Sequence, residues 1–222
     1  MSDAPEPSKP QSDRAKWTHG RILDAAGQVF VKNGYEGATV NDIIRAAGVT
    51  KGAFYFHFRE KRDLAVAILE STLQVDGLVT QEFKLQEVVD VGMILSHKII
   101  RDSKTMAALR LSLTHEAREN YGTPWPEWIK FNNAQLKEAQ QRGEIGPDVN
   151  TLAQAHQISG TWSGLVLTGH SIYGSLEGLE GRVADMYLNL MTVISHPRIL
   201  RKLDFSPTRG RDLYQAFLDQ RS

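Results

Sequence analysis

The sequence predicts an all-α protein that consists of a three-helix N-terminal domain and a larger C-terminal helical domain. Apolar residues recur at three- and four-residue spacing along most of the 222 residues, and no segment shows the alternating pattern of a half-buried strand. Residues 1–12 differ from the rest, because they contain three prolines and no periodic apolar face. We therefore expect a disordered arm over residues 1–12, a first domain over 13–62 and a second domain over 63–222.

Residues 39–61, with the sequence TVNDIIRAAGVTKGAFYFHFREK, predict a helix-turn-helix. Thr39 can cap a helix in which Asp42 completes a capping box, and Gly48 can end that helix in the left-handed conformation. Thr50 is then placed to cap a second short helix. Spacing alone would also fit an ordinary helical hairpin.

The second helix of this pair, residues 51–57, has the two faces that a DNA-reading helix needs. Phe54 and Phe58 lie four residues apart and are expected to face inward. The outward face offers small residues where a helix approaches base edges, and hydrogen-bond donors where it meets phosphates. The residues that we expect to contact DNA are Thr39, Thr50, Lys51, Gly52, Ala53, Tyr55, His57 and Lys61.

Charge is unevenly distributed along the chain. The formal net charge is zero, yet residues 9–62 hold ten lysines and arginines against five aspartates and glutamates. Such a basic N-terminal domain would attract phosphates, whereas the acidic remainder would limit binding to DNA of any sequence. An apolar stripe over residues 22–30 predicts that a helix over 14–33 completes this domain.

Several classes of function are excluded by what the sequence lacks. It contains no cysteine, which removes disulfides and thiolate chemistry. His115 and Glu116 resemble the start of a zinc-protease motif, but Glu119 stands where its second histidine would be. No nucleophile is spaced with a base, no apolar run is long enough to span a membrane, and no signal peptide opens the chain. We expect a cytoplasmic protein that is not an enzyme and has no catalytic residues, metal or cofactor.

The C-terminal domain is predicted to be helical throughout. A helix over residues 61–79 is expected to connect the two domains and to transmit movement between them. Further helices are expected over residues 85–101, 104–120, 126–142, 149–173, 179–196 and 208–220.

Two of these helices, over residues 149–173 and 179–196, carry more apolar surface than one buried face needs. Gly160 and Gly164 would let two helix backbones approach closely, although Gly160 could equally make room for a ligand. We expect the two helices to form a homodimer that places two recognition helices about 34–36 Å apart, one turn of DNA.

A recognisable set of residues surrounds the helix-turn-helix. It comprises G-Y-x-x-x-T at Gly34, Tyr35 and Thr39, AGVTKGAFYFHF over residues 47–58, and Lys61 and Leu64. This set resembles the DNA-binding signature of the tetracycline-repressor (TetR) family. The resemblance implies a dimer that binds a pseudo-palindromic operator of double-stranded DNA, represses transcription and is released by a small-molecule ligand.

Three C-terminal segments carry a further resemblance: LQEVVDVGMILSHKI from residue 85, LRLSLTHEA from residue 109 and PWPEW over residues 124–128. They resemble the TetR subgroup that senses γ-butyrolactones and related autoregulators of filamentous bacteria. This resemblance implies that Trp128 lines the ligand cavity and stacks on the ring of the signal, and that Thr161 can hydrogen-bond its carbonyl. Other candidates for the mostly apolar lining are Val88, Met93, Leu109, Phe131, Trp162 and Leu165, which plain core packing would explain equally well.

Two alternatives keep this fold and change the ligand. A multidrug sensor that controls an efflux gene would place buried acids, with Glu87, Asp90 and Glu116 as candidates, against cationic compounds. A receptor homologue could instead have a different ligand or none.

Overall fold

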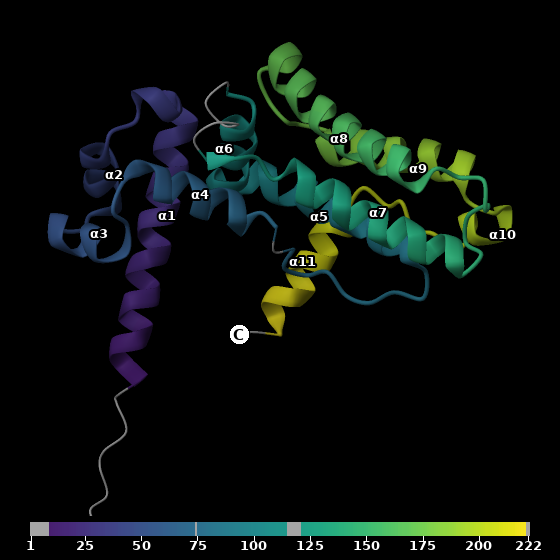
Figure 1. Cartoon of the computed structure of the whole chain (residues 1–222), viewed down its shortest axis with the longest axis horizontal. Coiled ribbons are helices and arrows are strands. Elements are labelled where there is room, and N and C mark those ends of the chain that lie inside the picture. Colours follow the sequence, from purple (N-terminus) through teal and green to yellow (C-terminus); the bar gives the residue numbers. More distant parts are fainter. Residues whose placement is uncertain (1–8, 74, 115–120, 221–222) are drawn as a thin grey trace, which may run out of the picture. The chain divides into compact units, whose positions relative to one another are not determined.

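A computed structural model describes residues 9–73, 75–114 and 121–220, and every regular element among them is a helix (Figure 1). The prediction of an all-α fold is therefore confirmed. The chain forms two compact units. The first runs to Ser71 and includes Ser103–Gly122, whereas the second comprises Thr72–Asp102 and Thr123–Ser222. The functional division that we predicted at residue 62 stays a prediction.

The first unit is built around helix α1. Its helices are α1 (Lys9–Gly37), α2 (Val40–Ala47), α3 (Lys51–His57), α4 (Lys61–Ser71) and α6 (Ser103–Ser112). Helices α2, α3, α4 and α6 all pack against α1. Helix α6 lies especially close, since a Cβ atom at Gly27 would come within 3.0 Å of the Lys104 nitrogen. Arg110 also donates a 2.6 Å hydrogen bond to the Val31 carbonyl, so α6 is an integral part of this unit.

Helix α1 begins earlier than we expected. Residues 9–12, which we had included in a disordered arm, are helical, while residues 1–8 lie outside the described residues. At its other end, Gly34 adopts the left-handed φ of 71° and interrupts the helical geometry. A glycine takes this conformation without steric cost, which allows the chain to turn towards α2.

The predicted helix over residues 61–79 is too long. Helix α4 ends at Ser71, and residues 75–83 are not helical. Ser71 donates a 2.7 Å hydrogen bond to the Ile68 carbonyl, which competes with the continuation of the helix. The predicted helix over residues 104–120 also ends early, at Ser112, and residues 115–120 lie outside the described residues.

The second unit is arranged around helix α5. It contains α5 (Lys84–Arg101), α7 (Trp125–Gln141), α8 (Thr151–Tyr173), α9 (Leu179–Ile194), α10 (Pro197–Leu200) and α11 (Arg209–Asp219). Helix α5 packs against α7, α9 and α11, and 13 of its 18 residues are buried. Helix α8 lies on α7 and α9 (Figure 1). The predicted ranges for these helices were correct to within two residues at each end.

Buried charges hold the second unit together. Glu144 accepts hydrogen bonds from the backbone N–H groups of Lys84 and Leu85, both at 3.0 Å, and so caps the buried start of α5. Asp90, which is fully buried on α5, forms a two-bond ion pair with Arg209 of α11. Two charge-assisted hydrogen bonds offset the cost of burying the Asp90 carboxylate.

Helix α11 approaches the backbone of α5 so closely that only glycine fits at position 210. A methyl group at Gly210 would overlap the Met93 carbonyl oxygen, whereas Gly181 of α9 has open space around it. We expect Gly210→Ala to lower the free energy of unfolding by about 1–3 kcal/mol through overpacking. The control Gly181→Ala should be neutral or gain about 1 kcal/mol, because alanine favours helices. Urea unfolding followed by circular dichroism measures both, and equal stability of the two variants would contradict the close packing.

Candidate DNA-binding surface and ligand cavity

Helices α2 and α3 form the predicted helix-turn-helix. Thr39 accepts a 3.1 Å hydrogen bond from the N–H of Asp42, and Thr50 accepts one of 3.2 Å from Ala53. Each threonine thus caps the start of its helix. Between the helices, Gly48 has the left-handed φ of 61° and ends α2. The turn is therefore fixed by the local residues that predicted it.

Helix α3 divides into an inner and an outer face as expected. Phe54 and Phe58 are buried in the core of the first unit. Lys51, Gly52 and Tyr55 are exposed, and Ala53 and His57 are partly exposed.

Phe56 of α3 was missed by the sequence analysis, although 78% of its surface is exposed. An apolar side chain on a DNA-reading helix can contact a thymine methyl group. Positions 54, 56 and 58 are all phenylalanine. Because Phe54 and Phe58 fill the inner face of the helix, this spacing could have shown that Phe56 lies on the outer face.

Two acidic side chains near α3, those of Asp42 and Asp63, have partners of their own. Asp42 forms an ion pair with Arg45. Its hydrogen bonds to Thr39 and then to Arg45 lower the pKa of the Asp42 carboxyl. Asp63 accepts hydrogen bonds from the backbone N–H groups of Arg59 and Glu60. Within the described residues, no ion pair forms at Lys51, so its charge is available to a phosphate.

Lys61 has a structural role that the sequence did not predict. Its ammonium donates hydrogen bonds of 2.6 Å to the Tyr35 carbonyl and 3.1 Å to the Ala38 carbonyl, and it lies 4.3 Å from the centre of the Tyr35 ring. Two of its three N–H donors are used in this way. The contact of Lys61 with DNA stays a prediction that depends on the remaining donor.

A histidine pair supports the C-terminal end of α3. His19 of α1 stacks on Phe58 with ring centres 4.8 Å apart and meets His57 edge-on at 5.7 Å. Burial, followed by repulsion from His57, lowers the pKa of His19. His19 therefore stays neutral at physiological pH and packs as an aromatic ring against the end of the reading helix.

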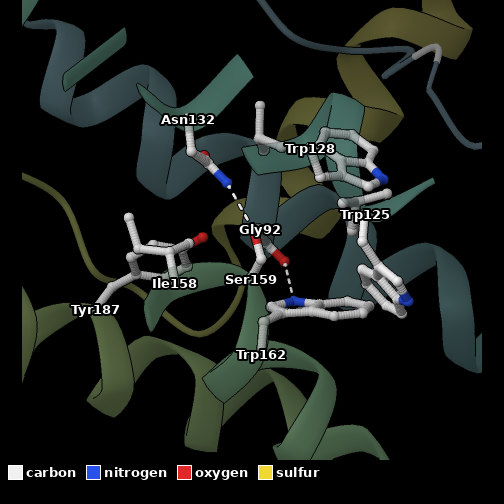
Figure 2. A pocket seen from close by; sticks show the side chains of 10 residues that line it. Gly92, Trp125, Trp128, Asn132, Ile158, Ser159, Trp162 and Tyr187 are labelled. Atoms are coloured by element: carbon white, nitrogen blue, oxygen red, sulfur yellow. Dashed lines mark hydrogen bonds between the residues drawn. The ribbon is translucent and has the colours of Figure 1, made fainter. Parts of the chain in front are cut away.

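A small cavity lies inside the second unit among α5, α7, α8 and α9 (Figure 2). Its lining is mostly apolar and consists of Val91, Gly92, Leu95, Trp125, Trp128, Asn132, Ile158, Ser159, Trp162 and Tyr187. The volume that the centres of water molecules can occupy in this cavity is about 40 Å³. This is room for about three waters. A larger guest would fill this space and extend beyond it.

The polar groups of the cavity are unequally satisfied. Trp162 donates its indole N–H to the Gly92 carbonyl and the Ser96 hydroxyl, each at 3.1 Å. Asn132 donates a weak hydrogen bond to the Ser159 hydroxyl, since their distance of 3.5 Å is at the upper limit for such a bond. Its side-chain oxygen is buried and has no partner. Burial raises the pKa of the Tyr187 phenol, with a further contribution from Asp90, so Tyr187 stays protonated.

The structure brings only some of the predicted ligand residues to this cavity. Trp128 and Trp162 line it, and Phe131 packs edge-on against Trp128 at 6.0 Å between ring centres. Val88 and Met93 are fully buried on α5 without lining the cavity.

The remaining three predicted residues lie elsewhere. Leu109 lies on α6 of the first unit. Thr161 and Leu165 line a groove between α8 and α9 instead. Trp125, Asn132 and Ser159 line the cavity without having been predicted to do so. Trp125 and Asn132 are three residues before and four residues after Trp128, so their spacing already places them on its helix face.

The groove between α8 and α9 is lined by apolar and polar side chains, among them the exposed Val193. Val193 is 82% exposed, Leu188 outside the groove on α9 is 43% exposed, and nothing lies within 4 Å of a Cβ atom at Gly160 or Gly164 of α8. Arg182, which lines the groove, has two buried nitrogen atoms without a hydrogen-bond partner.

Two buried acids of the second unit, Asp90 and Glu87, already have cationic partners. Asp90 is paired with Arg209, while Glu87 is paired with Lys84 at 3.0 Å and accepts a 2.9 Å hydrogen bond from Gln135. Glu116 lies outside the described residues. Across the parts of the chain that the structure describes, no cluster of three or more potential ligands could hold a metal ion. No helix among them is long and apolar enough to cross a membrane.

Comparison with known proteins identifies the family. Residues 22–68 match the model for the bacterial regulatory proteins of the tetR family. The A-factor receptor protein of Streptomyces griseus is 34% identical over 188 residues, which cover 84% of this chain and 67% of that protein. The chain therefore belongs to the TetR family, and its helix-turn-helix makes it a DNA-binding regulator. Because the relatives are regulators, the prediction that it is not an enzyme is confirmed.

Solved structures agree with this assignment. Full-length TylP, a TetR regulator from Streptomyces fradiae, is 33% identical with a TM-score of 0.85, over 92% of this chain and 99% of that chain. A γ-butyrolactone receptor described as ArpA-like is 26% identical with a TM-score of 0.71, over 91% of this chain and 99% of that one. The predicted resemblance to the autoregulator receptors is thus confirmed.

Lys51 provides a test of the DNA-binding surface. We expect Lys51→Ala to weaken binding to a duplex from the gene's upstream region, because one phosphate contact per subunit is lost. The slope of log affinity against log salt concentration should fall by about one for each subunit. Fluorescence anisotropy at several salt concentrations measures both quantities. Lys130→Ala, which removes an exposed lysine of α7, is the matched control, and equal salt slopes for the two variants would show that α3 is misassigned.

Proposed function

We propose that this protein is a ligand-responsive transcriptional repressor. As a homodimer it binds a pseudo-palindromic operator, and a small lipophilic autoregulator of the γ-butyrolactone, furan or butenolide type releases it. One observation carries the proposal: the second unit of this TetR-family chain contains an apolar cavity with three tryptophans in its walls. Operator binding also implies that the protein acts in the cytoplasm.

The chemistry of the cavity favours a neutral, partly apolar ligand. Indole rings provide flat apolar walls against which a small ring can stack. A cationic drug would need an unpaired carboxylate, yet Asp90 and Glu87 already have cationic partners. The observation that would favour the multidrug alternative is therefore missing among the described residues. The known relatives support the same reading, because one is a receptor for A-factor and another a receptor for γ-butyrolactones.

Helix α5 offers a route from the ligand to the DNA. It carries Val91, Gly92 and Leu95 of the cavity wall, and its last residue is separated from α6 by Asp102 alone. Helix α6 in turn packs against α1 and α4 in the first unit. We therefore assign the transmission to the junction of α5 and α6, since α4 ends too early to connect the units as one continuous helix.

The small size of the cavity explains why binding would change the conformation. A lactone with an alkyl chain is far larger than three waters, and we infer that it binds an expanded state of the second unit. A ligand that binds one state alone shifts the population to that state. Changing the ratio of the expanded to the unexpanded state from 1:99 to 99:1 requires the ligand to bind the expanded state more tightly by about 5.5 kcal/mol.

The groove between α8 and α9 is the surface that we assign to the dimer. Its exposed apolar side chains favour burial against a second copy.

Val193 tests the dimer. We expect Val193→Glu to give a monomer that binds DNA at least tenfold more weakly, because a charge would be buried in the interface. Light scattering after size-exclusion chromatography measures the mass. Leu218→Glu on α11, where the leucine is 40% exposed, is the matched control and should remain dimeric. A dimeric Val193→Glu variant would place the interface elsewhere.

Trp128 tests the ligand site. A gel shift with the gene's upstream DNA should be lost when an extract of the producing culture is added. We expect Trp128→Ala to bind the same DNA with unchanged affinity and to keep the shift in the presence of extract, because a stacking surface is lost. If the dose of extract that releases the wild-type protein from DNA also releases the variant, the ligand binds elsewhere. A wild-type shift that no extract fraction changes would contradict the proposed sensor and favour a receptor homologue with no such ligand.

A further inference from the structure

Asn132 is an anomaly in the cavity wall. Its side chain is 5% exposed, and its Oδ1 atom is buried without a hydrogen-bond partner. A buried polar atom that lacks a partner costs about 1–3 kcal/mol, and folded proteins contain few of them. An apolar side chain at this position would pack without that cost, so the amide needs a reason to be there.

The neighbours of Asn132 do not supply the missing donor. Figure 2 shows its amide nitrogen directed at Ser159 and the indole N–H of Trp162 directed at Gly92. That indole also donates to Ser96 and has no further proton to give. Among the described buried side-chain atoms that line the cavity, Oδ1 of Asn132 is the one without a partner. Water can satisfy it in the empty protein, and a ligand that displaces this water must provide a donor in its place.

We propose that Asn132 fixes the orientation of the ligand by accepting a hydrogen bond from a ligand hydroxyl group. This inference rests on the proposed function and narrows its ligand class to small ring-containing lipids that carry an alcohol. A lactone carbonyl alone cannot satisfy an acceptor. The apolar part of the ligand lies against the tryptophan walls, which include Trp128 on the same face of α7, one helical turn before Asn132.

Asn132 thereby takes the place that the family resemblance suggested for Thr161. The Thr161 side chain is exposed and lines the groove between α8 and α9. Ser159, two residues earlier on α8, lines the cavity instead, and its hydroxyl accepts a hydrogen bond from the Asn132 amide. The polar side of the cavity is therefore formed by one residue from α7 and one from α8.

Tryptophan fluorescence can test this proposal, because three of the four tryptophans of the chain line the cavity. The probes are a 2-alkyl-γ-butyrolactone with a hydroxymethyl group on the ring and the analogue with a methyl group instead. Wild-type protein should bind the alcohol about 5- to 150-fold more tightly, the ratio that corresponds to one unsatisfied polar atom. In Asn132→Leu, which has no acceptor, the two affinities should become equal.

Asn133→Leu is the matched control, since Asn133 is the next residue of α7 and does not line the cavity. It should keep the preference for the alcohol. Asn132→Ala is a second variant with the same expected result as Asn132→Leu, and circular dichroism shows whether each variant is folded.

The outcomes separate this inference from the proposed function. Equal affinity of wild-type protein for both lactones would overturn the role of Asn132 and leave the lactone sensor standing. A preference for the alcohol that persists in both Asn132 variants would also overturn it. If neither lactone quenches the tryptophan fluorescence of the wild-type protein, both proposals are overturned, because each names a ligand of this type.

Discussion

The burial of helix α5 is the constraint on which the second unit depends. A helix enclosed by α7, α9 and α11 has no water to solvate its polar groups, so each group must find a partner inside the protein. Glu144 caps its start, Asp90 is bound by Arg209, and Glu87 is bound by Lys84. These contacts connect α5 to α11 and to the turn after α7. They fix the rotation of α5 about its axis, because a rotated helix would leave the Asp90 charge unpaired.

A helix fixed in this way responds to pressure from one side by moving as a whole. Close-packed interiors transmit strain rather than absorb it, and the cavity lies directly against the middle of α5. In the proposed function, expansion of the cavity displaces α5 together with Asp102, which precedes the start of α6 in the chain. Helix α6 is bound to α1 through the hydrogen bond from Arg110 to the Val31 carbonyl. We propose that the ligand acts on the first unit through this connection of the chain.

The sequence predicted local features more accurately than those that depend on distant partners. Thr39, Gly48 and Thr50 could be assigned because a cap or a left-handed turn is determined within four residues. Thr161 was assigned to the cavity from a resemblance, but α8 has two apolar faces, one towards the cavity and one towards the groove. Periodicity cannot distinguish such faces, so a shift of one or two residues exchanges Ser159 for Thr161. The end of the first helix near Gly34 could be predicted in the same way as the caps. The hydrogen bonds that Lys61 donates to the Tyr35 and Ala38 carbonyls could not, because they join residues more than 20 positions apart.

The unsatisfied amide oxygen of Asn132 and the small cavity that it lines both depart from ordinary core packing. Natural cores avoid both empty space and unpaired polar atoms, and where a protein retains them the local arrangement serves a function rather than stability. The empty state of this cavity is less stable than a packed core would be, which lowers the cost of exchanging it for an occupied state. A ligand that binds only the folded protein then adds to its stability according to concentration and affinity. In the proposed function, the atom without a protein partner in the empty cavity, Oδ1 of Asn132, is also the one that a donor on the ligand would satisfy.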